Sequence, residues 1–492
     1  MAVAQASLIE SAAMALRRVE ARYPAAEAAP YDPTEAFPEL VARGVPVGAG
    51  GGPGNQVFAA VREVLHGLGL DEGRFGTAEW NPLGDLVAAG GRVLVKPNWV
   101  LHFNQREGAG MDCMVTHPSV LRAVLEYVFL AGPSEVVLGD APLQGCAFGR
   151  LQAFGGLPEV LASFARRGLK VDVRDFRRTI LDPGTSGPRA VRENLRDESH
   201  YVLAQLGGDS FLEPISRDWR RFRVTMYDPR LMAPHHQPGH HEFLLAREVF
   251  DADLVVNCPK LKTHKKAGLT CCLKNLIGIN GNKEYLPHHR KGAVEAGRGG
   301  DSHGPDWWVV DGLESALDFI NRHRDHPRFY DWAERWIYRL ERHVVQRRFP
   351  GGQMEGNWHG NDTIWRTCLD LNRALIYGDA EGRQHGTPQR QEISIVDAVV
   401  AGQGEGPLEP FALPTGAVFG ARNPAVGDYV AAHLLGFDPK KIPLVAHSCD
   451  AIRNPVCSLA ADEVSAAAAA LVGGAGEFPA AEPAAGWAGH VR

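Results

Sequence analysis

The chain has 492 residues, of which 45% are hydrophobic and 22% are charged, and its formal net charge is −6. This composition is typical of a globular protein with a large core, and the length predicts two or three domains. The acidic balance argues against general nucleic-acid binding, which needs an extended basic surface. The sequence contains no run of 18 apolar residues, so it predicts no transmembrane helix. The eight cysteines form no C-x-x-C pair, so we expect reduced thiols in a cytoplasmic protein without a membrane partner.

The N-terminal region, residues 1–55, is predicted to be a helical segment followed by a glycine-rich linker. Its first part, MAVAQASLIESAAMALRRVEARYP, places the arginines after the apolar residues. That order is wrong for a secretory signal and is typical of an amphipathic helix. The stretch GVPVGAGGGPGN at 44–55 predicts a turn or linker before the core.

Strands and helices alternate along the next part of the chain. The strand RVLVKPN at 92–98 is followed by a helix at 117–132 and by the strand EVVLGDAP at 135–142. A second helix leads to the strand KVDVRDF at 170–176, and a further strand, DLVVNCP, spans 253–259. This alternation predicts a parallel sheet with right-handed crossovers. The predicted fold class is therefore α/β, a mostly parallel sheet flanked by helices, in two lobes with a helical insertion.

Composition divides the rest of the chain. We expect an α/β lobe with a lysine-rich motif at 56–300, a helical insertion or cap at 301–390, the C-terminal part of the α/β core at 391–463, and an alanine- and glycine-rich, partly disordered tail at 464–492.

Polar residues follow the predicted strands, at the edge where open α/β sheets bind ligands. Lys96 and Asn98 belong to KPN, Asp140 belongs to GDAP, and Asp397 begins DAVVAGQGEGP. Each also has a simpler interpretation, because a strand-end lysine can reach solvent and an aspartate can stabilise a turn. His117, beside the start of a predicted helix, is a candidate acid or base.

The most basic part of the chain is NCPKLKTHKKAGLTCCLKNLIGINGNKEYLPHH at 257–289. A solvated face would have acids between the lysines, but no acid occurs from Lys260 to Lys283. A helix predicted at 269–278, with Thr270 as its cap, would direct its N-terminus toward the lysines and favour an anion. The segment therefore predicts an anion-binding site. The four histidines of HHQPGHH at 235–241 lack the spacing of a zinc protease and are predicted to lie in a surface loop.

The candidate residues fall into three groups. The predicted acid/base residues are Asp140, His117, His264 and Asp397. The predicted substrate-binding residues are Lys96, Asn98, Lys260, Lys262, Lys274, Asn275 and His288. The carboxylates that could hold a divalent metal are Asp140, Asp397 and Glu405.

Five motifs together resemble the family catalogued as domain of unknown function 362. They are KPN, GDAP, PKLKTHKKAGLTCCLKNLIG, DAVVAGQGEGP and NPAVGDYVAAHLLGFDP, in this order, between about residues 92 and 440. Some members of that family carry a ferredoxin-like domain with C-x-x-C-x-x-C runs, which this chain lacks. The family is also distantly similar to the nickel-pincer lactate racemases, which implies a two-lobed α/β protein. Where the family pattern has Gly-Asn-Gly, this chain has Gly404-Glu405-Gly406.

These features lead us to expect a cytoplasmic enzyme for a small anionic substrate, namely a carboxylate, a sugar acid or a phosphate ester. The substrate would bind in a lysine-rich cleft between lobes and react by metal-assisted acid/base chemistry. The cofactor is open, with a divalent or transition metal as the candidate, and a homo-oligomer is possible. Two alternatives stay open. One is a redox or metallocofactor protein that uses the histidines and Cys258, Cys271 and Cys272, and the other is a non-catalytic module for a polyanion or glycan.

Overall fold

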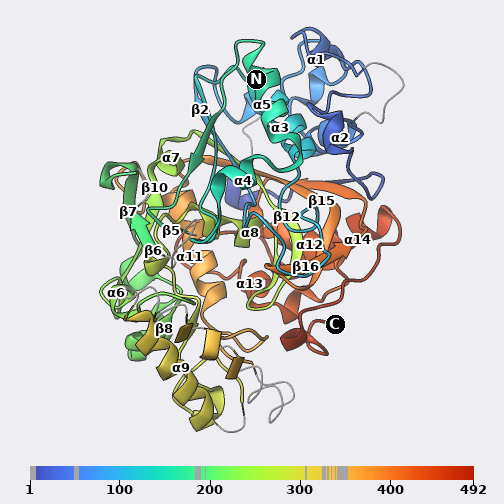
Figure 1. The fold of residues 1–492 in the computed structure, drawn as a ribbon. Helices are drawn as coiled ribbons and strands as arrows, with labels where there is room; N and C mark the ends of the chain where they lie inside the picture. The colour runs from blue at the N-terminus through green and yellow to red at the C-terminus, as the bar shows by residue number, and fades with distance from the viewer. Residues whose placement is uncertain are drawn as a thin grey trace.

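The computed structural model describes residues 7–48, 55–182, 190–193, 196–304, 307–323 and 353–492, and several positions between 329 and 340. A large sheet with helices on both faces forms its core (Figure 1). The predicted α/β class is therefore confirmed.

Ten strands make up the large sheet. They are β1 (Met14–Arg18), β2 (Arg92–Pro97), β3 (Glu135–Asp140), β4 (Asp172–Asp175), β11 (Leu254–Cys258), β12 (Lys260–His264), β13 (Gly268–Thr270), β15 (Gln391–Glu405), β16 (Glu409–Leu413) and β17 (Ala417–Ala421). The main order is β1-β17-β15-β11-β2-β3-β4, and β12 and β16 pair with β15. Neighbours from β15 to β4 are parallel, whereas β17 and β1 form an antiparallel edge.

The central strands are buried on both faces, as is usual for parallel strands covered by helices. Their alternating side chains divide the apolar core in two. Val93 and Val95 of β2 pack with one cluster, and Leu94 between them packs with the other. The carboxyl ends of β2, β3 and β11 therefore meet at one edge of the sheet.

Two layers of helices cover the sheet. The first layer contains α2 (Val57–Gly67), α3 (Pro118–Leu130) and α5 (Leu157–Ala165). The second contains α7 (Arg247–Asp251), α8 (Cys272–Asn275), α11 (Ile364–Tyr377), α12 (Pro424–Leu434), α13 (Pro443–Ala446) and α14 (Ala461–Gly474). Three other helices are α1 (Pro38–Val41), α4 (Phe148–Gln152) and α6 (Pro229–Met232).

Smaller sheets lie to one side of the large one (Figure 1). They are formed by β7 (Tyr201–Gln205), β10 (His240–Ala246) and β9 (His236–Gln237), by β8 (Phe222–Arg223) and β14 (His289–Arg290), and by β5 (Thr179–Asp182) and β6 (Ala190–Glu193). The helix α9 (Trp307–Asn321) lies beside β8 in the figure.

The predicted insertion at 301–390 contains the helices α9 and α11 together with described turns and loops, and it is not simply a cap. Its second described helix, α11, is buried along its length and packs into the main core. Parts of the insertion between 324 and 352 lie outside the described residues.

Both ends of the chain differ from prediction. The N-terminal segment contains the edge strand β1 where a helix was expected, because residues 14–18 pair with β17 in the sheet. The C-terminal tail is ordered by packing. It contains α14, and Trp487 and Val491 are buried in the main core. The expected disorder is therefore wrong, since these apolar residues reach a core that a local composition window does not reveal.

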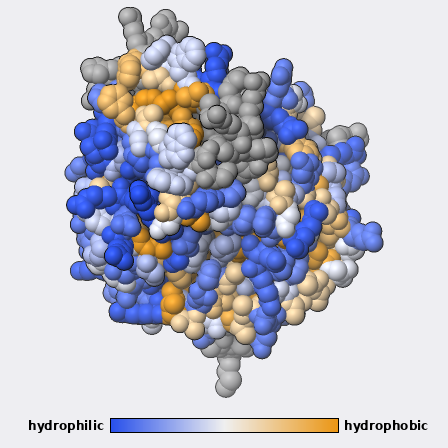
Figure 2. Space-filling view, turned by 90° about the horizontal axis from the view of Figure 1, so that it is seen from below, coloured by the Kyte–Doolittle hydropathy of each residue, from blue (hydrophilic) through white to orange (hydrophobic). Residues whose placement is uncertain are grey.

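Among the described residues, no helix is both long and apolar enough to cross a bilayer. Seen from below, hydrophilic residues cover most of the surface, with hydrophobic patches between them (Figure 2).

Replacing Trp487 with alanine should test whether the tail is part of the folded core. The Trp487 ring is 1% exposed, and its Nε1 donates to the carbonyl of Lys265 at 2.8 Å. We expect the variant to lose about 3–5 kcal/mol of unfolding free energy in chemical denaturation, as for other buried aromatic truncations. Trp308→Ala is the control, because Trp308 is 60% exposed and its loss should change stability by about 0.5 kcal/mol or less. Equal effects would contradict the packing of the tail.

Candidate functional site

An ion pair joins the ends of β2 and β3. Lys96 Nζ lies 2.8 Å from Asp140 Oδ1 and also donates to the carbonyl of Pro97 at 2.7 Å. The carboxylate of Asp140 further accepts the backbone amides of Trp99 and Ala141, at 2.6 and 2.8 Å. Burial raises the pKa of Asp140 and lowers that of Lys96, while their attraction opposes both shifts. Both oxygens of Asp140 are engaged, so this carboxylate holds Lys96 in place.

The predicted amides connect this pair to the lysine-rich motif. Asn98 Nδ2 donates to Asn275 Oδ1 at 2.7 Å, and Asn275 Nδ2 donates to Asn257 Oδ1 at 2.8 Å. The ammonium of Lys262 donates to Asn98 Oδ1 and to the carbonyl of Met114. Burial lowers the pKa of Lys262 far below its usual range. The structure therefore brings the KPN motif, Lys262 and Asn275 together, as polar residues buried in one network.

Asp397 is the centre of a second buried network. Lys260 Nζ lies 3.1 Å from Asp397, and the Tyr23 hydroxyl donates to the same carboxylate at 2.5 Å. The backbone amide of His117 donates to it at 2.9 Å, and the His117 ring stacks on Tyr23 with 3.9 Å between centroids. His117 Nδ1 lies 2.8 Å from the Ser119 hydroxyl, and burial lowers the pKa of its ring. Tyr23 was not predicted, because it lies in the N-terminal segment far from every motif.

The third group surrounds Lys274. Its ammonium makes no hydrogen bond or ion pair with any residue that the structure describes, although the side chain is only 8% exposed. Burial lowers the pKa of Lys274. It also lowers the pKa of His264 and of His288, and the positive charge of Lys274 is the next cause for both. No carboxylate in the described chain counts among the causes that shift these three groups. We call Lys274, His264 and His288 the cationic cluster, with Lys274 as its charged member.

The two histidines of this cluster carry their protons on different nitrogens. His264 Nδ1 accepts the backbone amides of Lys266 and Ala267, at 3.0 and 3.2 Å, so the proton of the neutral ring is on Nε2. His288 Nδ1 faces the carbonyl of Leu286 at 2.7 Å, so that nitrogen carries the proton and Nε2 has a free lone pair. One ring can therefore donate a proton through Nε2 and the other can accept one.

Two further lysines lie near the cluster and were not among the predicted site residues. Lys283 Nζ donates to the carbonyl of Ala141 at 3.1 Å, and burial lowers its pKa to about 7. Burial lowers the pKa of Lys266 to about 8. Both belong to the basic segment, so its composition was the available signal. That composition could not indicate which lysines are buried.

The three carboxylates predicted to hold a metal do not meet. Glu405 lies eight positions after Asp397 on β15, roughly 26 Å along an extended strand. Three strand spacings, roughly 14 Å, separate Asp140 on β3 from Asp397. Glu405 instead accepts the backbone amide of Ala485 in the C-terminal tail at 2.6 Å. β15 continues to Glu405, and a turn at residues 406–408 follows it.

Two local expectations also need correction. The helix expected at 269–278 begins later, at Cys272, where α8 is followed directly by a 3-10 turn at Leu276–Ile279, and the hydroxyl of Thr270 caps nothing. No helix N-terminus of useful length therefore adds to the cationic cluster. The stretch at 235–241 is a hairpin whose tip at residues 238–240 is exposed, as expected for a surface loop, whereas His236 and His241 are fully buried.

Fold and site together define an α/β protein with buried lysines at the carboxyl edge of a mostly parallel sheet. Residues 218–433 match the family model described as domain of unknown function (DUF362). This match confirms the family resemblance for the lysine-rich and later motifs. KPN and GDAP lie before the matched residues.

Two other similarities extend the comparison. A protein named thylakoid-associated protein, from Synechocystis sp. (strain ATCC 27184 / PCC 6803 / Kazusa), is 27% identical over 238 residues. These residues are 47% of this chain and 54% of the relative, so the chain spans about half the length of this curated relative. A crystal structure of a Thermotoga maritima protein is similar with a TM-score of 0.30 and 13% identity, over 72% of this chain and 53% of that one.

Asp140→Asn should show how strongly the ion pair at the strand ends holds the site. The variant leaves the buried ammonium of Lys96 without its counter-charge, so we expect a loss of roughly 3–5 kcal/mol in unfolding free energy by chemical denaturation. Adding Lys96→Met should restore part of this loss, because the lone charge is removed. The control is Asp462→Asn, because Asp462 and its partner Lys440 are 83% and 71% exposed. An Asp140→Asn effect no larger than that of the control would contradict a structural ion pair.

The depressed pKa of Lys283 predicts a pH dependence of stability. Between pH 7 and pH 10, roughly, the unfolded chain binds more protons at this lysine than the folded chain, so stability should rise with pH. Denaturation of wild type and Lys283→Met near pH 7 and near pH 9 measures this contribution. The wild type should gain stability relative to the variant at the higher pH. Parallel pH profiles would mean that Lys283 is not buried as described.

Proposed function

We propose that the protein is an enzyme that binds a small anionic substrate at Lys274 and transfers protons through His264 and His288. The substrate class is a carboxylate, a sugar acid or a phosphate ester. One observation carries the proposal. Lys274 keeps a buried ammonium without any hydrogen-bond or ion-pair partner in the described part of the chain. An anionic oxygen would supply the missing charge and hydrogen bonds.

The arrangement of the two histidines supports acid/base chemistry beside the anion. Their lowered pKa values keep both rings neutral near pH 7. His264 then has an Nε2–H that can donate to a substrate oxygen, and His288 has an Nε2 lone pair that can accept a proton. A bound anion would raise both pKa values toward neutrality, where proton transfer in either direction is efficient. Lys283, with a pKa of about 7, is a further candidate base.

The proposal differs from the sequence-based expectation in the role of the acids. Asp140 and Asp397 hold Lys96 and Lys260 by ion pairs, and Glu405 bonds to the tail. Asp140 and Asp397 therefore position lysines, whereas Glu405 anchors the tail. The proton-transfer steps are assigned to the histidines, and metal assistance by these three carboxylates is not part of the proposal.

The cellular location of the enzyme is part of the same proposal. We place it in the cytoplasm, with all eight cysteines as free thiols. The name of the Synechocystis relative associates that protein with thylakoids, which supports a location at a membrane surface as the competing hypothesis. Cell fractionation in low and high salt distinguishes the two. Self-association stays a prediction.

Thermal unfolding in phosphate should test the anion site. A ligand at one hundred times its dissociation constant stabilises the folded state by about 2.7 kcal/mol, so phosphate should raise the Tm of the wild type. Phosphate also stabilises proteins without binding, because it is excluded from their surfaces. The measured quantity is therefore the difference between wild type and Lys274→Met, in phosphate and in sodium chloride of equal ionic strength.

Lys170→Met is the matched control, since the Lys170 side chain is 81% exposed. It should respond to phosphate as the wild type does, whereas Lys274→Met should respond less. If all three proteins respond alike, Lys274 is not an anion site and the proposed function loses its main support.

A further inference from the structure

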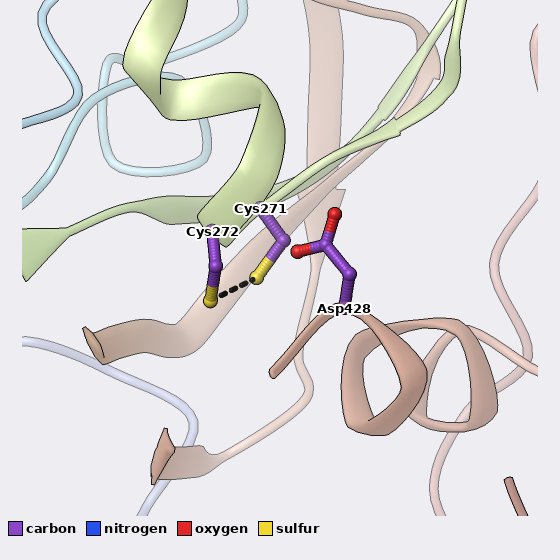
Figure 3. Close-up of side chains that lie close together, drawn as sticks. All are labelled: Cys271, Cys272 and Asp428. Atoms are coloured by element: carbon purple, nitrogen blue, oxygen red, sulfur yellow. Dashed lines mark hydrogen bonds between the residues drawn. The ribbon is translucent and has the colours of Figure 1, made fainter. Parts of the chain in front are cut away.

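Three ligand side chains converge where α8 packs against α12. They are Cys271, Cys272 and Asp428, and Figure 3 shows the carboxylate of Asp428 beside the two sulfur atoms. Their ligand atoms all lie within 4.8 Å of one another, and all three residues are buried. No other group of three or more such side chains meets this closely in the described chain. This group is separate from the cationic cluster around Lys274.

The distance between the two sulfurs fits a metal better than a disulfide. Cys271 Sγ and Cys272 Sγ are 3.7 Å apart. Two thiolates on one tetrahedral zinc ion, each about 2.3 Å from it, are separated by about 3.8 Å. A disulfide would need about 2.05 Å. The two sulfurs can therefore bind one ion without moving relative to each other.

Unpartnered carboxylate oxygens give an independent indication of a cation. Asp428 Oδ2 is buried without a well-formed hydrogen bond, and its Oδ1 accepts the amide of Leu273 at 3.4 Å, so the thiols of Cys271 and Cys272 are the main polar groups facing this carboxylate. Glu392 Oε2 is also buried and unpartnered. Asn257 Nδ2 links this second carboxylate to the group, because it donates to Glu392 Oε1 at 3.2 Å and to the carbonyl of Cys272 at 3.0 Å. Buried acceptors of this kind lose free energy unless a proton or a cation satisfies them.

We propose that Cys271, Cys272 and Asp428 bind a thiophilic divalent metal ion of the zinc type. Thiolate ligands select zinc over magnesium or calcium. On binding, the two thiols lose their protons to solvent and the metal accepts a lone pair from each sulfur, so no redox step is involved. The site is closed to solvent, which is typical of structural metal sites.

The backbone leaves room for the sulfur of Cys272. A Cβ at Gly427 of α12 would lie 2.5 Å from Cys272 Sγ, so only glycine allows this approach. The metal would connect α8 to α12 and so stabilise the turn that carries Lys274 and Asn275. This role goes beyond the proposed anion chemistry and does not depend on it.

The first test uses the full chain, reduced and stripped of metal with a chelator, then dialysed against zinc. We expect one ion per chain by elemental analysis. X-ray absorption at the zinc edge should find two sulfur ligands at about 2.3 Å with oxygen in the remaining positions. A shell of nitrogen and oxygen alone, as surface histidines would give, overturns the proposal, and so does failure to retain zinc.

Substitutions then identify the ligands. Cys272→Ser should weaken zinc binding at least tenfold in competition with a chromophoric chelator, and Asp428→Asn should weaken it less. Cys146→Ser is the control, because Cys146 is buried in the other apolar cluster. It should bind as the wild type does. Equal affinity in Cys272→Ser and wild type overturns the proposal. If Cys272→Ser does not fold, the number of sulfur ligands found by X-ray absorption in the wild type decides whether the proposal holds.

Lys274→Met separates this site from the anion site. The variant should keep its zinc while losing the response to phosphate. Loss of zinc on this substitution would contradict two independent sites.

Discussion

Buried ammonium groups constrain the centre of this protein more than any other feature. Moving a lysine charge out of water costs several kcal/mol, which only close opposite charges or oriented oxygens can offset. Lys96 has Asp140, and Lys260 has Asp397. Lys262 has no acid and instead donates to an asparagine oxygen and a backbone carbonyl. The strand ends, the first loop after β2 and the N-terminal segment must all be in place before these charges are satisfied.

Lys274 differs from these lysines in a way that locates the candidate site. Its side chain is buried at 8% exposure, against 0% for Lys96, Lys260 and Lys262, and no described residue provides an oxygen for its ammonium. The same fold that places acids beside Lys96 and Lys260 leaves this position open, and the two nearest histidines are neutral and polarised in opposite directions. Fixed lysines around one unsatisfied lysine form a preorganised environment for an external anion.

The sequence predicted where the polar residues gather but not which of them interact. The strand pattern predicted that KPN and GDAP end at the same sheet edge, and Lys96 does meet Asp140 there. Strand-end position could not show that this carboxylate is fully engaged, because that depends on loop amides. Tyr23 was not predicted as a site residue, because the alanine-rich N-terminus favours a helix locally. In the structure, pairing with β17 makes β1 a strand. Tertiary contacts likewise order the tail that composition alone describes as disordered.

The position of Lys274 depends on the orientation of α8, a helix that is too short to be stable without contacts to its neighbours. A single helical turn is unstable in isolation, so its orientation must come from its neighbours. Asn372 of α11 donates to the carbonyl of Leu273 at 3.0 Å, and Asp428 of α12 accepts the amide of the same residue. Asn98 fixes Asn275 at the other end of the turn. A metal between α8 and α12 would strengthen the weakest of these contacts, since the bond to Asp428 is the longest of the three. The cysteine group would fix the orientation of α8, and the cationic cluster needs that orientation because α8 carries Lys274.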